Sequence, residues 1–176
     1  YLADYPDMKI HIEGGELQGY FDLTRGMTNE DWMLLREKLL DKSNIVNMKG
    51  EHIVHVMRND LVQSALAESN NEMEGLVRVW SNIVQCEEEL MGFEDELEGR
   101  FRNIWNAFSI NHSYMYATTY GTYYSDGTLS TVLNYNTITT TGGAIWGPSH
   151  EMGHNHQASI NVVGATEVSN NLFSNV

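Results

Sequence analysis

The residues best suited to chemistry are His150, Glu151 and His154, which form an H-E-x-x-H motif near the end of the chain. On a helix, His154 lies about 40° around the axis from His150 and one turn along, so both imidazoles can reach one tetrahedral metal ion. Glu151 projects to the side of that pair, where it can hold and deprotonate a metal-bound water. With 7 His and 16 Glu in 176 residues, chance would produce this motif only about 0.025 times. The motif predicts a metallohydrolase.

A third metal ligand must come from elsewhere, because a catalytic zinc ion usually has three protein ligands and one open position. The best candidate is Glu167, which opens a second helical stretch and is one of only three acidic residues after position 102. The alternative is a charge at a helix N-terminus, worth about 0.3–1 kcal/mol. Asn171, one turn further, can hydrogen-bond Glu167 or can be an ordinary buried asparagine.

Other residues near the motif are poorer ligands. His156 sits about 240° around the helix from His150 and should point away from the metal. Gln157 lies about 20° from His150 two turns on and could support the ligand face, although packing is the commoner reason for such a residue. Gly153 costs about 1 kcal/mol relative to alanine inside a helix, so we expect another backbone to approach closely there. The pair His52 and His55 would face opposite ways on a strand, so we do not expect a site there.

The elements that must position these residues are predicted from periodicity and turn signals. The helix that carries the motif should begin at Pro148 and Ser149. The predicted elements are two strands of a hairpin around Gly14-Gly15 between Met8 and Leu23, a helix from Thr28 through Leu40, a short strand over Glu51–Arg58, one or two helices over Leu61–Gly92, strands and loops over 100–140, and a helical end.

Composition indicates one folded domain of 20.0 kDa, or one piece of a larger enzyme. The net charge of −14 argues against binding to nucleic acid or to anionic lipid surfaces. No apolar run approaches the roughly 20 residues of a membrane-spanning helix, and residues 1–8 do not resemble a signal peptide. The single cysteine, Cys86, lies in an apolar helical pattern and is expected to be buried and inert.

These residues resemble the enhancin-like zinc metallopeptidases, which belong to the gluzincins. The resemblance rests on His150–Gln157 and on the later stretch Gly164–Ser174. It is supported by His11–Gly15 leading to Gly19–Asp22, which is similar to the strand pair that opens the catalytic domain of this family. Residues 24–140 match only in their order of elements. The resemblance implies an α+β zincin fold in which N-terminal strands and helices are followed by the metal helix and the start of a helical subdomain.

The resemblance also implies the site and the domain organisation. His150, His154 and Glu167 would bind zinc, and Glu151 would be the general base while zinc-bound water attacks a peptide carbonyl. We expect residues 1–176 to form a truncated catalytic domain, with an α/β portion over 1–145 and metal-binding helices over 146–176. Thr137–Trp146 would be the cleft-edge strand, with Thr139–Gly143 as the rim of the cleft. In gluzincins a Tyr or His after the third ligand often stabilises the oxyanion. We expect that group beyond Val176; otherwise Tyr135 substitutes or the piece is incomplete as a catalyst.

The substrate class implied by the resemblance is mucin-type O-glycosylated protein, and secretion or cell-surface display follows from that class. Several tyrosines could stack on sugars, although packing on a core is the commoner role of such residues. They are Tyr114, Tyr116, Tyr120, Tyr123 and Tyr124. Two alternatives stay open: a noncatalytic module that binds mucin glycans, and a zinc amidohydrolase that acts on another amide. The oligomeric state is not predicted.

Overall fold

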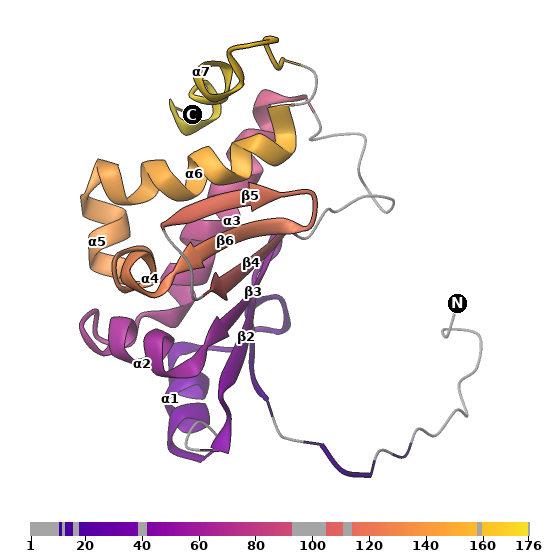
Figure 1. Ribbon diagram of the computed structural model, residues 1–176. Coiled ribbons are helices and arrows are strands. Elements are labelled where there is room, and N and C mark those ends of the chain that lie inside the picture. The colour runs from indigo at the N-terminus through magenta and orange to yellow at the C-terminus, as the bar shows by residue number, and fades with distance from the viewer. Residues whose placement is uncertain are drawn as a thin grey trace.

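The structure is a computed structural model that describes residues 11, 13–15, 18–38, 42–92, 105–110, 114–157 and 160–175 (Figure 1). Its strands are β1 (Gly19–Asp22), β2 (Ile45–Lys49), β3 (Ile53–Arg58), β4 (Trp105–Ile110), β5 (Met115–Thr118) and β6 (Gly121–Ser125). Its α-helices are α1 (Asn29–Lys38), α2 (Asn59–Ala67), α3 (Met73–Leu90), α4 (Asp126–Val132), α5 (Tyr135–Thr140), α6 (Gly142–His156) and α7 (Thr166–Asn170). Short 3-10 turns, η1 (Leu23–Arg25) and η4 (Phe173–Asn175), follow β1 and α7.

The described strands form one mixed sheet in the order β1-β2-β3-β4-β6-β5. Strand β1 pairs parallel with β2, and β4 pairs parallel with both β3 and β6. The pairs β2–β3 and β5–β6 are antiparallel. Strand β5 therefore lies at one edge of the sheet, and α6 packs along it (Figure 1).

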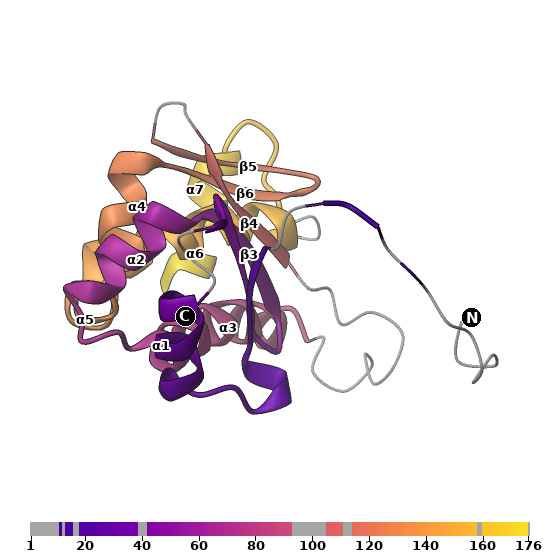
Figure 2. The same cartoon turned by 90° about the horizontal axis from the view of Figure 1, so that it is seen from below.

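Helices cover one face of this sheet. Figure 2 shows α1 to α5 gathered on one side of β3 and β4. Strands β2 and β3 bury alternate residues, as expected when one face meets a helical layer. At the centre of that layer, the Trp80 ring makes edge contacts with His55 and Tyr124, at centroid distances of 4.8 and 5.3 Å. Burial lowers the pKa of His55 to about 4, although the Met48 carbonyl opposes this shift.

Several predicted elements are confirmed. Helix α1 starts as expected, because Asp31 Oδ2 accepts a 2.9 Å hydrogen bond from the Thr28 amide in a capping arrangement. The strand predicted over Glu51–Arg58 is β3. The segment Leu61–Gly92 holds two helices, and the break between them includes two asparagines, Asn70 and Asn71, at φ +55° and +59°.

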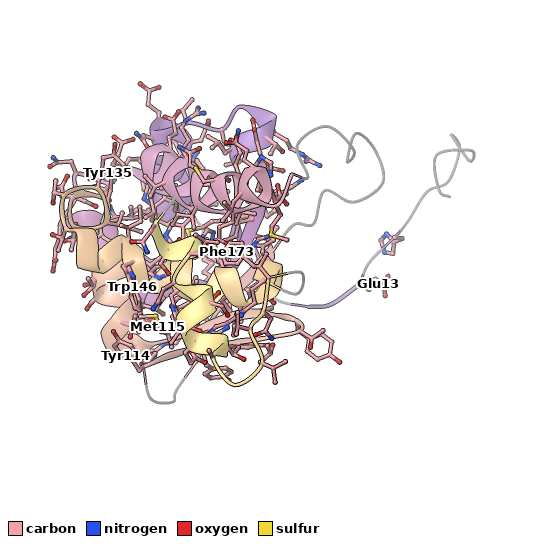
Figure 3. The ribbon with its side chains drawn as sticks, turned by 90° about the horizontal axis from the view of Figure 1, so that it is seen from above. Glu13, Tyr114, Met115, Tyr135, Trp146 and Phe173 are labelled. Atoms are coloured by element: carbon pink, nitrogen blue, oxygen red, sulfur yellow. The ribbon has the colours of Figure 1, made fainter. Side chains whose placement is uncertain are left out.

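The predicted hairpin around Gly14-Gly15 is corrected in part. Its second strand is present as β1, but β1 pairs parallel with β2. Among the described residues between 11 and 18 there is no strand, and Figure 3 shows Glu13 well away from the body of the molecule. The remaining residues of the predicted first strand lie outside the described part of the chain. Alternation within this segment did not reveal that the partner of β1 is β2, 26 residues later in sequence.

Residues 126–140 are helical, whereas the sequence predicted strands and loops there. The Ser125 side chain accepts a hydrogen bond from the Thr128 amide, and the Asn134 side chain accepts one from Thr137. These caps begin α4 and α5 despite the many β-branched residues, whose strand preference is weak beside capping and burial. The expected cleft-edge strand over Thr137–Trp146 and its rim over Thr139–Gly143 are wrong for the same reason, and the edge strand that α6 packs against is β5.

In the described part of the chain, no helix combines the length and the apolar character needed to cross a membrane.

Candidate metal centre

Helix α6 carries the H-E-x-x-H motif and begins at Gly142, six residues before the predicted start. Pro148 therefore lies inside the helix, where it cannot donate the usual backbone hydrogen bond. The helix is nevertheless packed on several sides, since it contacts α3, α5, the η4 turn and the edge strand β5. His150 and His154 lie one turn apart, with ring centroids at 4.9 Å and ring planes at 86°. The two imidazoles thus converge edge to face, as the spacing predicted.

Glu167, on the short helix α7, completes a three-residue cluster. Its Oε2 atom lies 3.0 Å from His150 Nε2 and 3.3 Å from His154 Nε2. The Glu167 side chain is 75% exposed, whereas the side chains of His150 and His154 are 12% and 19% exposed. The hydrogen bond with His150 lowers the pKa of Glu167, and the charge of His154 adds to this effect, although slight burial opposes it. Three potential ligand atoms are thus gathered within 4.8 Å of one another.

Two of the three distances within this cluster match those between neighbouring ligands of a tetrahedral zinc ion. Bonds of about 2.0–2.1 Å from zinc to nitrogen or oxygen place neighbouring ligand atoms about 3.3 Å apart. The two Nε2–Oε2 distances, 3.0 and 3.3 Å, are close to that spacing. Two imidazoles and one carboxylate are also a donor set that suits zinc. The residues present therefore fit the metal that the sequence predicted.

Amide side chains contact the Nδ1 atoms of both imidazoles, whereas the Nε2 atoms face Glu167. Gln157 Oε1 lies 2.7 Å from His154 Nδ1, and Asn171 Oδ1 lies 3.2 Å from His150 Nδ1. If Nδ1 donates to these amide oxygens, each Nε2 is left with a lone pair for a metal ion. Of the two roles considered for Gln157, support of the ligand face and packing, this contact favours support. Asn171, the residue that caps the C-terminus of α7, contacts His150, which is neither of the two roles considered for it from the sequence.

Two further residues touch the cluster and were not predicted. Trp146 stacks on the His150 ring, with centroids at 4.8 Å and an interplanar angle of 24°. Asn170, fully buried, donates from Nδ2 to the His150 carbonyl at 2.5 Å, which ties α7 to α6. The position of Trp146 one turn before His150 was a usable signal in the sequence. The contact of Asn170 depends on how the two helices pack.

The close approach expected at Gly153 is present, but side chains make it. A Cβ atom on Gly153 would lie 2.6 Å from Asn170 Oδ1 and 2.7 Å from Phe173 Cβ. His156 points away from the cluster as predicted and pairs with Glu87, with Nδ1 2.7 Å from Oε2. Glycine at position 153 therefore allows the segment that bears Glu167 to lie against the motif.

Glu151 lies in a cleft of about 670 Å³ between α6, α7 and the edge strand β5. Burial raises the pKa of Glu151 and the charge of Glu167 adds to the rise, while His150 and His154 oppose it. The lining residues of the cleft are Met115, Tyr116, Ala117, Thr118, Thr119, Glu151, His154, Asn155, Thr166 and Glu167. The cleft thus places a carboxylate with a raised pKa beside the candidate ligands.

Most of the tyrosines considered for sugar stacking have other surroundings. Tyr124 is fully buried, and Tyr123 is stacked between Phe108 and Tyr116 at centroid distances of 5.0 and 4.9 Å. Tyr114 and Tyr120 are 70% and 79% exposed. The face of the Tyr116 ring toward Tyr123 is occupied, so packing accounts for Tyr123, for Tyr124 and for one face of Tyr116.

Tyr135, considered as an oxyanion-stabilising group, does not line the cleft. It packs against α3, where its Cε2 atom would lie 2.6 Å from a Cβ atom on Gly75. Figure 3 shows it apart from Met115 and Trp146.

His52, His55 and Cys86, which were also considered from the sequence, lie outside the cluster. His52 pairs with Glu88 at 3.0 Å, and His55 is buried against Trp80. Cys86 is only partly buried; burial and the nearby glutamates Glu89 and Glu87 raise the pKa of its thiol, which disfavours the reactive thiolate.

Solved metallopeptidases share this fold. One from Bacteroides thetaiotaomicron is 34% identical with a TM-score of 0.77, over 89% of this chain and 26% of the other. A metallopeptidase in complex with Tn antigen is 35% identical with a TM-score of 0.77, over 89% of this chain and 28% of the other. The M60 catalytic domain of Clostridium perfringens ZmpC, in complex with the sialyl T antigen, shares the fold at 18% identity and a TM-score of 0.68, over 92% and 32%.

These similarities define the class as metallopeptidase. Residues 20–176 match the model of the family Peptidase M60, enhancin and enhancin-like, so the chain belongs to that family. The family predicted from the motif and its flanking residues is thereby confirmed. Among proteins of curated function, no match is found. The chain spans only about a quarter of the length of the two more similar solved chains.

Proposed function

We propose that the chain carries the active site of a zinc-dependent endopeptidase of the gluzincin type, which hydrolyses peptide bonds in mucin-type O-glycosylated proteins. The observation that carries this proposal is the convergence of His150 Nε2, His154 Nε2 and Glu167 Oε2 within 4.8 Å, with Glu151 in the same cleft. In this assignment the three converging residues are the zinc ligands, and residues 1–176 belong to the catalytic domain.

The side chains divide the chemistry between them. Bound zinc would supply a Lewis acid that polarises the scissile carbonyl and makes water more acidic. Glu151 takes a proton from the attacking water and later gives it to the leaving amine. Its raised pKa suits both steps, because a group that accepts and then donates a proton works best with a pKa near the operating pH. Gln157 and Asn171 keep the two imidazoles oriented throughout.

The cleft offers a place for an extended peptide. Strand β5 lines it and pairs with β6 on one side, and among the described residues no strand pairs with its other side. A substrate backbone can therefore add to this edge as a further strand. The glycan part of the proposal is supported by the two solved metallopeptidases that hold Tn antigen and sialyl T antigen. Secretion or display at the cell surface follows from this substrate class.

The test is a digest of an O-glycosylated mucin peptide, with and without chelator, beside elemental analysis for zinc. Glu151→Gln should retain zinc and lose cleavage, and Glu167→Ala should lower zinc affinity. Asp126→Asn is a matched control, because this acid pairs with Arg58 outside the cleft. Full cleavage by Glu151→Gln would refute the mechanism. Glycopeptide binding without cleavage would indicate a noncatalytic module, and turnover of an unrelated amide alone would indicate an amidohydrolase.

A further inference from the structure

Glu87 is a buried carboxylate that the proposed chemistry does not use. It lies on α3 behind the metal helix, and its side chain has no exposed surface. A carboxylate in the protein interior is costly unless hydrogen bonds satisfy it. Burial raises the pKa of Glu87 to about 7, while contacts with His156 and Ser149 oppose the rise. The positions of His156 and Ser149 in the chain indicate a role for the Glu87 carboxylate.

Both partners of Glu87 belong to α6 and flank the H-E-x-x-H motif. Glu87 Oε2 lies 2.7 Å from His156 Nδ1, and Glu87 Oε1 lies 3.2 Å from Ser149 Oγ. Ser149 immediately precedes the first ligand, His150, and His156 follows the second ligand, His154, by two residues. At 100° per residue, Ser149 and His156 lie within about 20° of each other, on the side of α6 away from the ligands.

The same contacts extend to the segment that follows the third candidate ligand. Ser149 Oγ also lies 3.1 Å from the Phe173 carbonyl, in the η4 turn directly after α7. Phe173 in turn packs against Gly153 of α6. One buried cluster, Glu87 with Ser149, His156 and Phe173, therefore joins α3 to α6 and to the turn next to α7.

We propose that Glu87 is a positioning residue of the metal centre, which fixes the rotation and axial position of α6 so that the imidazoles of His150 and His154 meet at one point. This inference rests on the proposed function, because it takes the H-E-x-x-H histidines as metal ligands. Glu87 acts through Ser149 and His156 and does not itself line the cleft. Residues that orient metal ligands typically change metal affinity tenfold to a hundredfold when replaced.

Glu88 provides a matched control on the next position of the same helix. It also pairs with a histidine, since its Oε2 lies 3.0 Å from His52 Nδ1, and its side chain is only 12% exposed. That pair joins α3 to the residues just before β3 and does not involve α6. If a buried glutamate–histidine pair on α3 acted only through general stability, Glu87→Gln and Glu88→Gln would have the same effect on metal binding.

The experiment measures zinc affinity of the 176-residue chain by competition with a chromogenic chelator, and the visible spectrum of its cobalt(II) form. Circular dichroism and thermal unfolding establish that each variant is folded. Glu87→Gln is expected to weaken zinc binding about tenfold to a hundredfold and to alter the cobalt spectrum. Glu88→Gln is expected to leave the zinc affinity within about twofold of wild type and the cobalt spectrum unchanged. Ser149→Ala, which removes one of the two contacts and no charge, should give a smaller loss and serves if Glu87→Gln does not fold.

The outcomes separate this inference from the proposed function. Wild-type zinc affinity and cobalt spectrum in Glu87→Gln, or in Ser149→Ala if Glu87→Gln is unfolded, would overturn the positioning role. An equal loss in the Glu88 control would overturn it as well. A wild-type chain that binds zinc without cleaving glycopeptide would count against the proposed activity alone, and the positioning role would still be judged on zinc affinity. A wild-type chain that binds no zinc overturns both.

Discussion

Replacement of Gly153 by alanine tests whether the contact between α6 and the segment after α7 holds the metal centre together. The added Cβ atom would lie 2.6 Å from Asn170 Oδ1, 2.7 Å from Phe173 Cβ and 3.1 Å from Phe173 Cγ. Asn170 cannot turn aside freely, because it is fully buried and its amide donates to the His150 carbonyl. Phe173 is also fully buried, so its backbone must move.

The magnitude follows from two opposing effects. Overpacking of this kind costs about 1–3 kcal/mol. Alanine in a helix interior is favoured over glycine by about 1 kcal/mol, which offsets part of that cost. We therefore expect Gly153→Ala to lower the free energy of unfolding by up to about 2 kcal/mol. It should also lower zinc affinity, because the displaced segment adjoins the helix that carries Glu167.

Urea denaturation followed by circular dichroism measures the first effect, and chelator competition measures the second. Gly143→Ala is the matched control, because it lies in the same helix and nothing comes within 4 Å of an added Cβ atom there. That variant should be neutral or slightly stabilised. If Gly153→Ala proves as stable as Gly143→Ala and binds zinc as tightly, the close approach described for this interface is not tight enough to matter.

Three further predictions concern other contacts. Burial raises the pKa of Asp22, but hydrogen bonds from Thr24 and Tyr20 and the charge of Lys49 outweigh it and leave the pKa below its usual value. Stability from Asp22 is therefore present above about pH 4 and lost as the pH falls through its lowered pKa, so thermal midpoints of wild type and Asp22→Asn should converge in acid. Gln157→Ala should weaken zinc binding about tenfold to a hundredfold in chelator competition, since it removes the partner of His154 Nδ1. Trp146→Ala should cost at least about 0.5–1.5 kcal/mol in urea denaturation, because the stack on His150 is lost in addition to the buried area of the ring.

The cluster of His150, His154 and Glu167 could be predicted because two of its members are fixed by local helical geometry. A helix sets the relation of residues four apart without reference to the rest of the chain. Glu167 was found because acidic residues are scarce in the second half of the sequence. The contacts of Glu87 and Asn170 could not be predicted in this way, because they depend on how α3 and α7 pack against α6.

The fold was predicted less completely than the site. Strand β3 and helices α1 to α3 have clear periodicity, whereas α4 and α5 consist largely of residues that favour strands. Their helical state depends on the caps Ser125 and Asn134 and on burial of Leu129, Val132 and Ile138. The position of β5 beside α6 required knowledge of the sheet order, in which β6 is inserted between β4 and β5. Pairing between distant segments is not encoded in any short window of sequence.

The exposed position of Glu167 gives a bound metal ion a mechanical role. His154 is anchored in α6, whereas Glu167 projects from a five-residue helix with its side chain 75% exposed. An ion held by both would be a cross-link that closes a loop of 12 intervening residues. A covalent link across a loop of about 15 residues stabilises a protein by about 3 kcal/mol, through the entropy that the unfolded chain loses. A chelator would therefore remove a stabilising cross-link between α6 and α7 together with the ion proposed for catalysis.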